Sequence, residues 1–240
     1  MCTVTYLPAG KGFYLTSNRD ERHTRVPAAK PIVHNVNGTK LIFPKDGTAL
    51  GTWIAMKQNG DAACLLNGAF EAHVPQPPYR LSRGLILLDI ATNPDLCQAF
   101  DTMDLHQVEP FTLVIVQHHH LYECRWDGSQ KFLMQLNEHQ PYIWSSSTLY
   151  PLATRLRRKQ WFEVWQNTID NPSQTDVINF HLQTGDGDTH NDLVMNRHNE
   201  VATVSITGIF VNGATANMQY FDLINNEITN VDFERNLQPC

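Results

Sequence analysis

Short runs of β-branched and aromatic residues, separated by turn-forming residues, make up much of the chain and predict strands. The first two runs enclose the turn residues 8–12, and a later pair encloses residues 58–61, where Asn-Gly is typical of a tight hairpin turn. The predicted strands cover residues 3–7, 13–16, 52–57, 62–66, 111–117, 121–126, 131–135, 142–145, 202–212, 218–224 and 228–233.

Helical periodicity replaces the strand pattern in two parts of the chain. Apolar side chains recur at every third or fourth position over 81–92, which predicts a helix. Asn93-Pro94 has the composition of an N-cap and a first helical residue, and so predicts a second helix that continues through Phe100. A long helix is expected over 149–168, and a further helix is expected to begin at Asn171-Pro172.

The order of these elements indicates the fold class. Strands, helices, strands, helices and strands follow one another, and most strands are joined by short hairpins, which favours a mostly antiparallel α+β protein. The chain has no tandem repeat and no long linker, so we expect one domain over residues 1–240. Two sheets covered by helices would suit this order.

Composition narrows the possible partners. The net charge is −6, so a nucleic-acid partner is not expected, and any anion site must be local. No apolar run approaches the length of a membrane-spanning helix, and the first residues lack the pattern of a secretory signal. We therefore expect a cytoplasmic protein without an integral membrane segment.

The chain has five cysteines, at positions 2, 64, 97, 124 and 240. Their odd number and wide spacing, without a CxxC motif, argue against a disulfide framework and against a cysteine-rich zinc site. We expect no bound metal.

Cys2 has a distinctive chemical context, because removal of Met1 would leave it with a free α-amine beside its thiol. An α-amine titrates near pH 8 and a thiol near pH 8.5, so a base on the same residue could activate the nucleophile near neutral pH. The alternative is that Cys2 is a small apolar residue at the start of a strand.

The segment Thr16-Ser17-Asn18-Arg19-Asp20-Glu21-Arg22 follows the predicted return strand of the first hairpin. That hairpin would bring Asn18, Arg19 and Asp20 alongside Cys2. A carboxylate there could hold the α-ammonium group, and an arginine could lower the thiol pKa or bind an anionic substrate group. The alternative is a solvated charge cluster after a strand.

Several ungapped pieces of the chain resemble the NRDE-motif family, also called transport and Golgi organisation 2. They are Met-Cys-Thr-Val-Thr-Tyr at the start, Thr-Ser-Asn-Arg-Asp-Glu-Arg (16–22), Leu-Ile-Phe-Pro-Lys-Asp (41–46), Gly-Thr-Trp-Ile-Ala (51–55), Leu-Leu-Asn-Gly-Ala-Phe (65–70) and Arg-Leu-Ser-Arg-Gly-Leu (80–85). The resemblance implies a four-layer αββα sandwich related to the N-terminal nucleophile hydrolases.

A more distant resemblance to choloylglycine hydrolases and penicillin V acylases implies roles for individual residues. Cys2 matches the nucleophile, Asn18-Arg19-Asp20 matches an Asn-x-Asp element whose Asp contacts the N-terminal amine, and Asn67 matches the oxyanion asparagine. The chain departs from that pattern in two places. Ser17 stands where those enzymes have Arg, and Ser145-Ser146-Ser147 replaces a Thr-Asn element. Both departures count against bile salts and penicillins as substrates.

Two other groups of residues suggest binding. His118-His119-His120 lies between two predicted strands, and an exposed hairpin tip is a simpler interpretation than a metal site. Arg155, Arg158 and Lys159 share one face of the predicted long helix. They form either a solvated surface or a binding site for the acidic group of an acyl chain, acyl-CoA or haem.

The sequence thus supports two hypotheses. The first is a cofactor-free amidohydrolase in which Cys2 attacks the carbonyl group of a linear amide, Asp20 orients the amine, Asn67 holds the oxyanion and Arg19 steers the substrate. The second is a non-catalytic carrier of haem or of a lipid or acyl-CoA. The resemblance to the NRDE-motif family implies it, because members of that family are associated with haem trafficking and lipid metabolism. Fold alone does not decide between them.

Overall fold

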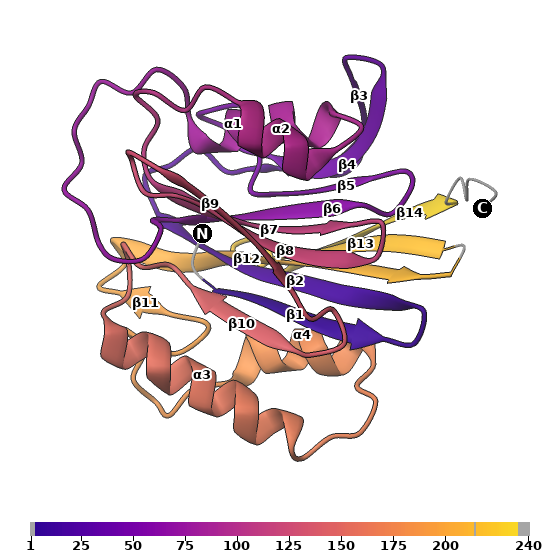
Figure 1. Ribbon diagram of the computed structural model, residues 1–240. Coiled ribbons are helices and arrows are strands. Elements are labelled where there is room, and N and C mark those ends of the chain that lie inside the picture. Colours follow the sequence, from indigo (N-terminus) through magenta and orange to yellow (C-terminus); the bar gives the residue numbers. More distant parts are fainter. Residues whose placement is uncertain (1–2, 214, 235–240) are drawn as a thin grey trace.

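The computed structural model describes residues 3–213 and 215–234. Within those residues the chain forms fourteen strands and four α-helices, and the strands form two seven-stranded sheets (Figure 1). Every pair of neighbouring strands is antiparallel. The predicted α+β class and antiparallel arrangement are therefore confirmed.

Sheet A joins the N-terminal hairpin to the C-terminal third of the chain. Its strand order is β10-β1-β2-β12-β13-β14, and β11 pairs with β12 outside this path. The strands are β1 (Thr3–Ala9), β2 (Gly12–Arg22), β10 (Tyr142–Ser145), β11 (Asn196–Arg197), β12 (Val201–Asn212), β13 (Thr215–Asp222) and β14 (Glu227–Glu234).

Sheet B is a meander in which each strand pairs with the next along the chain. Its order is β3-β4-β5-β6-β7-β8-β9. The strands are β3 (Ala29–Val36), β4 (Thr39–Lys45), β5 (Ile54–Lys57), β6 (Ala62–Asn67), β7 (Phe111–Gln117), β8 (His120–Trp126) and β9 (Lys131–Leu136). The hairpin predicted at Asn59-Gly60 joins β5 to β6, and Gly60 has the positive φ of 91° that this turn requires.

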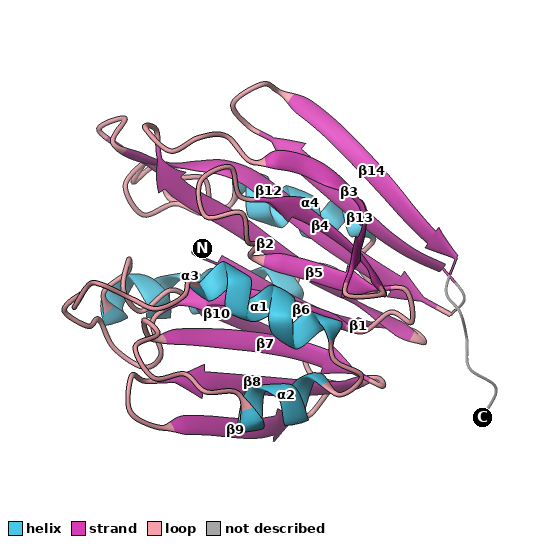
Figure 2. Cartoon of the chain, turned by 90° about the horizontal axis from the view of Figure 1, so that it is seen from above, coloured by secondary structure: helices cyan, strands magenta, loops and turns pink. Residues whose placement is uncertain are grey.

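Four helices cover the outer faces of the two sheets. Helices α1 (Arg83–Thr92) and α2 (Leu96–Thr102) lie on sheet B, whereas α3 (Leu152–Gln166) and α4 (Gln174–Gln183) lie on sheet A (Figures 1 and 2). The resulting order of layers is helix, sheet, sheet, helix. This is the four-layer αββα sandwich that the family resemblance implied.

The sequence pattern placed some boundaries wrongly. Asn93 ends α1 rather than capping α2, and the side chain of Asp95 caps α2 by accepting from Gln98 N. Similarly, α4 begins after Ser173, which forms a capping box with Asp176, and not at Asn171. In both cases an Asn-Pro pair stands immediately before the true cap.

Strands β3 and β4 were not predicted at all. β3 lies at the edge of sheet B, where most of its side chains are exposed or only half-buried, so it carries no apolar run.

Strand β2 is also longer than predicted, because it continues from residue 16 to Arg22. The charged segment after Thr16 is therefore part of a central strand and not a loop that follows it.

Alternating side chains of β2 contribute to two separate hydrophobic clusters. Phe13 and Leu15 belong to the large core between the sheets, whereas Tyr14 packs under the helices with Phe162 of α3 and Phe180 of α4. Odd-numbered positions of β2 therefore face sheet B, and even-numbered positions face the helix layer.

We predict that Leu15→Ala lowers the free energy of unfolding by about 3 kcal/mol, because Leu15 is 0% exposed and its removal leaves a cavity between the sheets. Leu156→Ala is the matched control, since Leu156 on α3 is 56% exposed and its truncation should change stability by less than about 0.5 kcal/mol. Urea unfolding of both variants measures the difference. Equal losses would contradict this account of the core.

Candidate active site

Strand β1 begins between two strands that carry site residues. Thr3 is paired with Asn18 of β2 on one side and with Ser145 of β10 on the other. Cys2 precedes Thr3 in the chain and lies outside the described residues. The predicted hairpin is nevertheless confirmed where it can be followed, since it brings Asn18 directly beside the first described residue of β1.

Two hydroxyl groups hold the carboxylate of Asp20, which is 5% exposed on the helix side of β2. The hydroxyl of Tyr150 donates to Asp20 Oδ2 at 2.5 Å, and the hydroxyl of Thr203 donates to Oδ1 at 2.6 Å. Tyr150 lies just before α3, and Thr203 pairs with Asp20 in the sheet. The two hydroxyls fix the orientation of this carboxylate near the start of β1.

Asn67 ends β6 in sheet B and is connected to the start of β1 through the segment after β10. Ser146, which follows the residue paired with Thr3, donates from its hydroxyl to the backbone oxygen of Asn67 at 2.9 Å. The next residue, Gly68, has a φ of 82°, and a Cβ there would lie 2.3 Å from Ser147 Oγ. Glycine therefore permits the close approach of the two segments.

Arg19 is buried on the opposite face of β2 from Asp20 and lies within an ion-pair network. Its guanidinium lies over the Trp53 ring, 4.5 Å from the centroid, and its Nη2 donates to Asp46 Oδ2 at 2.6 Å. Arg25 binds the same carboxylate through two hydrogen bonds of 2.9 and 2.8 Å. Both arginines also approach Glu21, at 3.6 and 3.4 Å.

This network controls the ionisation of Asp46. Burial alone would raise the pKa of this carboxyl. Hydrogen bonds from Arg25 and from the backbone N–H of Ala49 outweigh burial, and the charges of Arg25 and Arg19 add to their effect. The pKa of Asp46 is therefore lowered to about 2. Asp46 therefore remains ionised over the physiological range, and it links the end of β2 to the segment after β4.

A cavity of about 230 Å³ lies between the ends of the two sheets next to Asn67. Its wall includes Arg19, Trp53 and Arg83, as well as the Asn67 side of β6. Trp53 is 3% exposed, and its indole Nε1 has no hydrogen-bond partner among residues 3–213 and 215–234. A ligand that carries an acceptor oxygen would satisfy this buried donor.

Asn18 has a structural environment, with its side chain bonded to α4 and to the loop after α4. Its Nδ2 donates to the backbone oxygens of Leu193 and His181 at 2.7 and 3.2 Å, and its Oδ1 contacts His181 Nδ1. Because Oδ1 is only an acceptor, Nδ1 carries the proton, and His181 Nε2 accepts from the Thr5 hydroxyl at 2.7 Å. Burial, and then the charge of Arg158, lower the pKa of His181 to about 3, so the imidazole is neutral.

The structure does not bring Arg155, Arg158 and Lys159 together as a surface site. Arg158 is 0% exposed, and it donates to Thr3 Oγ1 and to the backbone oxygens of residues 191 and 192. Arg155 instead donates to the backbone oxygen of Phe70, while Lys159 is exposed and lies 3.8 Å from Glu163. The helix turns the three side chains toward different partners, so they do not form one anion site.

Four residues that shape the site were not among the candidates predicted from the sequence: Tyr150, Thr203, Trp53 and Arg83. Tyr150 and Thr203 belong to distant parts of the chain and meet Asp20 only through the sheet pairing and the segment before α3. Trp53 and Arg83 lie within segments that resemble the family, and their position in those segments was the one indication available.

The local geometry shows the role of the remaining candidate residues, the histidines between β7 and β8. His118 and His119 form the turn between β7 and β8 with positive φ angles of 50° and 67°, as the hairpin interpretation predicted. In the described part of the chain, no three His, Cys, Asp or Glu side chains converge in a way suited to a metal ion. None of the described helices is long and apolar enough to span a membrane.

The model of the Transport and Golgi organisation 2 family matches residues 1–234, and the chain belongs to this family. No curated protein matches the sequence.

The fold is similar to those of solved N-terminal nucleophile hydrolases. One is the Caenorhabditis elegans ortholog of N-acylethanolamine-hydrolyzing acid amidase, with a TM-score of 0.62, 12% identity, and coverage of 87% of this chain and 92% of that one. Two are forms of conjugated bile acid hydrolase from Clostridium perfringens. The form with a cysteine replaced by alanine has a TM-score of 0.60, 10% identity, and coverage of 97% and 92%. The form with an arginine replaced by leucine has a TM-score of 0.57, 10% identity, and coverage of 96% and 92%. These likenesses establish the fold.

We predict that Arg158→Met lowers the free energy of unfolding by about 3 kcal/mol, because it leaves Thr3 Oγ1 and two half-buried backbone oxygens without their donor. Lys159→Met, one position along the same helix, is the control and should have little effect, since Lys159 is exposed. Chemical denaturation of both variants tests this. A stable Arg158 variant would mean that the buried guanidinium is dispensable.

A second prediction concerns acid stability. The unfolded chain takes up a proton at His181 below about pH 6.5, whereas the folded chain resists it down to about pH 3. The stabilising contribution of neutral His181 is therefore complete above pH 6.5, and it is lost as the pH falls through the folded value. The C2-proton NMR resonance of His181 should not titrate between about pH 7 and about pH 4.5. A midpoint near 6.5 would show that the ring is accessible to protons.

Proposed function

We propose that the protein hydrolyses the carbon–nitrogen bond of a linear amide without a cofactor, with Cys2 as its N-terminal nucleophile after removal of Met1. The observation that carries the proposal is the placement of Thr3, the residue after Cys2. It is paired with the strand that contains Asp20 and with the strand that leads to the contact with Asn67. The start of β1 thus has the strand of Asp20 on one side and, through Ser146, a contact with the backbone of Asn67 on the other.

The fold supports this class of reaction. The similar structures include an amidase that hydrolyses N-acylethanolamines and a hydrolase of conjugated bile acids. We extend only the reaction class to this chain, because the identities of 12% and 10% are too low to transfer a substrate. Ser17 and Ser145–Ser147 replace residues of the bile acid hydrolase pattern, so a different substrate is expected.

In the proposed reaction, the α-amine of Cys2 takes the thiol proton, and the sulfur attacks the carbonyl carbon of the amide. Asp20 holds the resulting ammonium group in orientation, and the Asn67 side-chain amide donates to the developing oxyanion. The ammonium then gives its proton to the leaving nitrogen as the carbon–nitrogen bond breaks. Water hydrolyses the thioester, which releases the acid and restores the thiol.

The geometry also refines the role of Arg19. Asp46 and Trp53 hold the Arg19 side chain in one position. Arg19 therefore forms a fixed part of the wall of the cavity beside Asn67. Together with Arg83 and the indole N–H of Trp53, which has no partner among the described residues, it offers hydrogen-bond donors to a polar group of the substrate. We infer that the cavity takes the part of the substrate that is richest in acceptor oxygens.

The mechanism predicts a reactive N-terminal thiol. Intact-mass measurement should show a chain that lacks Met1, and iodoacetamide should label Cys2 much faster than Cys64, since burial raises the pKa of the Cys64 thiol to about 12. Retention of Met1 would remove the base from the mechanism. That result would instead favour the carrier of haem or a lipid that the family resemblance also implied.

Activity supplies the complementary test. A panel that contains an N-acylethanolamine, a glycine-conjugated bile acid and short N-acyl amino acids can be assayed for release of the amine. Cys2→Ala should abolish turnover, and Asn67→Ala should lower kcat by about 10²- to 10³-fold, the loss typical for an oxyanion donor. Cys64→Ala is the control and should retain activity. Turnover that survives Cys2→Ala would overturn the proposal.

A further inference from the structure

The segment that follows Asn67 is held by neighbouring strands of sheet B, one residue after another. Thr112 of β7 is paired with Arg125 of β8 in the sheet. The Thr112 hydroxyl donates to the backbone oxygen of Gly68 at 2.9 Å, and the Arg125 guanidinium donates to the backbone oxygen of Ala69. Two neighbouring strands therefore fix the two residues that come directly after Asn67.

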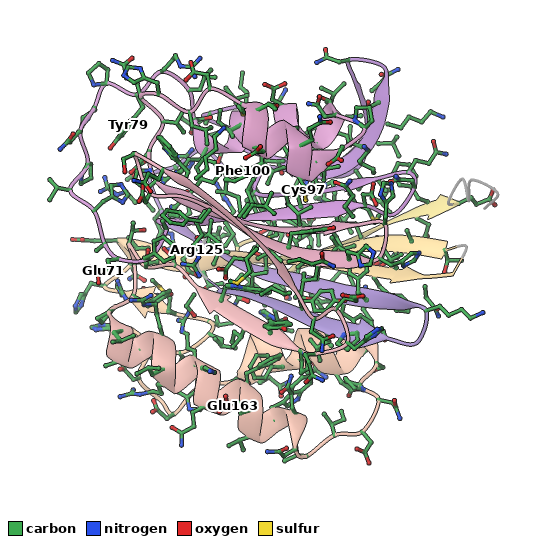
Figure 3. All side chains as sticks on the ribbon, in the orientation of Figure 1. Glu71, Tyr79, Cys97, Phe100, Arg125 and Glu163 are labelled. Carbon is green, nitrogen blue, oxygen red and sulfur yellow. The ribbon has the colours of Figure 1, made fainter. Side chains whose placement is uncertain are left out.

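Phe70 extends this arrangement to β9. Phe132 is paired with Arg125 in the sheet, and its ring meets the Phe70 ring edge-on, with the two centroids 5.0 Å apart. The Arg125 guanidinium lies over the Phe70 ring, 4.8 Å from its centroid. Figure 3 shows Arg125 and Glu71 at the same end of the sandwich. Arg125 thus contacts both Ala69 and Phe70, which are successive residues of the segment.

The guanidinium of Arg125 is itself fixed by a carboxylate that also contacts sheet A. Glu123, two positions earlier on β8, accepts from it through both oxygens, at 2.8 and 2.9 Å. The indole N–H of Trp144 donates to Glu123 Oε2 at 2.6 Å. Trp144 belongs to β10, where it is paired with Val4 of β1. A chain of hydrogen bonds therefore connects the strand beside β1 to the segment after Asn67.

The ion pair in this chain is largely buried. The side chains of Glu123 and Arg125 are 13% and 18% exposed. Burial raises the pKa of Glu123, but the hydrogen bond and the charge of Arg125, with the hydrogen bond from Trp144, lower it below its ordinary value. Glu123 is therefore ionised near neutral pH. A buried ion pair adds little net stability compared with apolar residues of the same size, whereas it does fix the geometry of its hydrogen bonds.

We propose that Arg125 is a positioning residue for the side-chain amide of Asn67. This role rests on the proposed function, in which the amide donates to the oxyanion. The nucleophile and this donor belong to different sheets, so their separation depends on contacts between the sheets. Ser146 supplies one such contact, at the backbone oxygen of Asn67, and the chain through Trp144, Glu123 and Arg125 supplies a second. A misplacement of about 1 Å can lower the rate about 10²-fold.

Steady-state kinetics test this role. Arg125→Met should lower kcat by about 10- to 100-fold and change KM by less than about twofold, because the variant displaces a donor that acts on the oxyanion. In a chain that also carries Asn67→Ala, Arg125→Met should lower kcat no further, since the group that it positions is gone. Arg80→Met is the control, because Arg80 binds the backbone oxygens of residues 104 and 106 instead of this segment.

NMR of the full-length protein tests the position of the amide without any substrate. The two side-chain N–H resonances of Asn67 are identified by their loss in Asn67→Ala. Arg125→Met should shift both resonances, whereas Arg80→Met should leave them unchanged. Glu123→Gln weakens the hold on Arg125 and keeps an acceptor for Trp144, so it should shift the resonances in the same direction by a smaller amount.

Two results would overturn the proposed role of Arg125. They are Asn67 amide resonances that stay unchanged in Arg125→Met, and a loss of kcat that is as large in the Asn67→Ala chain as in the wild type. A wild-type protein that turns over no amide would count against the proposed function, and the NMR comparison would still decide the role of Arg125. Glu123→Gln gives the same decision if Arg125→Met does not fold.

Discussion

The antiparallel pairing of β1 with both β2 and β10 is the constraint on which the candidate site depends. Because β1 is an internal strand, neighbours on both sides hold its backbone, and its first residue cannot shift without breaking two registers. Asp20 reaches the site through β2, and Asn67 reaches it through the serine segment after β10. Arg158 adds a third attachment at the side chain of Thr3.

Buried charge is divided between the two faces of sheet A. On the helix side, Arg158 is bonded to neutral oxygens and lies 3.7 Å from the centroid of the Tyr150 ring, and Tyr150 in turn holds Asp20. On the inner side, Arg19 is neutralised by Asp46. An uncompensated charge in either place would be costly, so each guanidinium comes with a fixed set of partners. These partners fix the positions of both guanidinium groups.

Sequence patterns predicted the fold where the local signal and the tertiary structure agree. The Asn59-Gly60 turn and the strands on both sides of it are recognisable because turn chemistry and apolar runs coincide. β3 escaped detection because an edge strand need not be apolar. The face shared by Arg155, Arg158 and Lys159 was misleading, since the partners of Arg158 are backbone oxygens of a distant loop, which no helical pattern encodes. Asn67 was identified only through the family resemblance, and its contact with Ser146 depends on the packing of two sheets.

The alternation of side chains along β2 restricts where residues can be inserted or deleted in the first hairpin of family members. Asp20 must face the helices and Arg19 must face sheet B, so inserting or deleting one residue between Gly12 and Asp20 would exchange the two faces. The turn at Gly10 has open space around it and can absorb such changes. Over evolutionary time, length variation in the first hairpin should therefore collect at its tip, while the spacing from Gly12 to Asp20 stays constant.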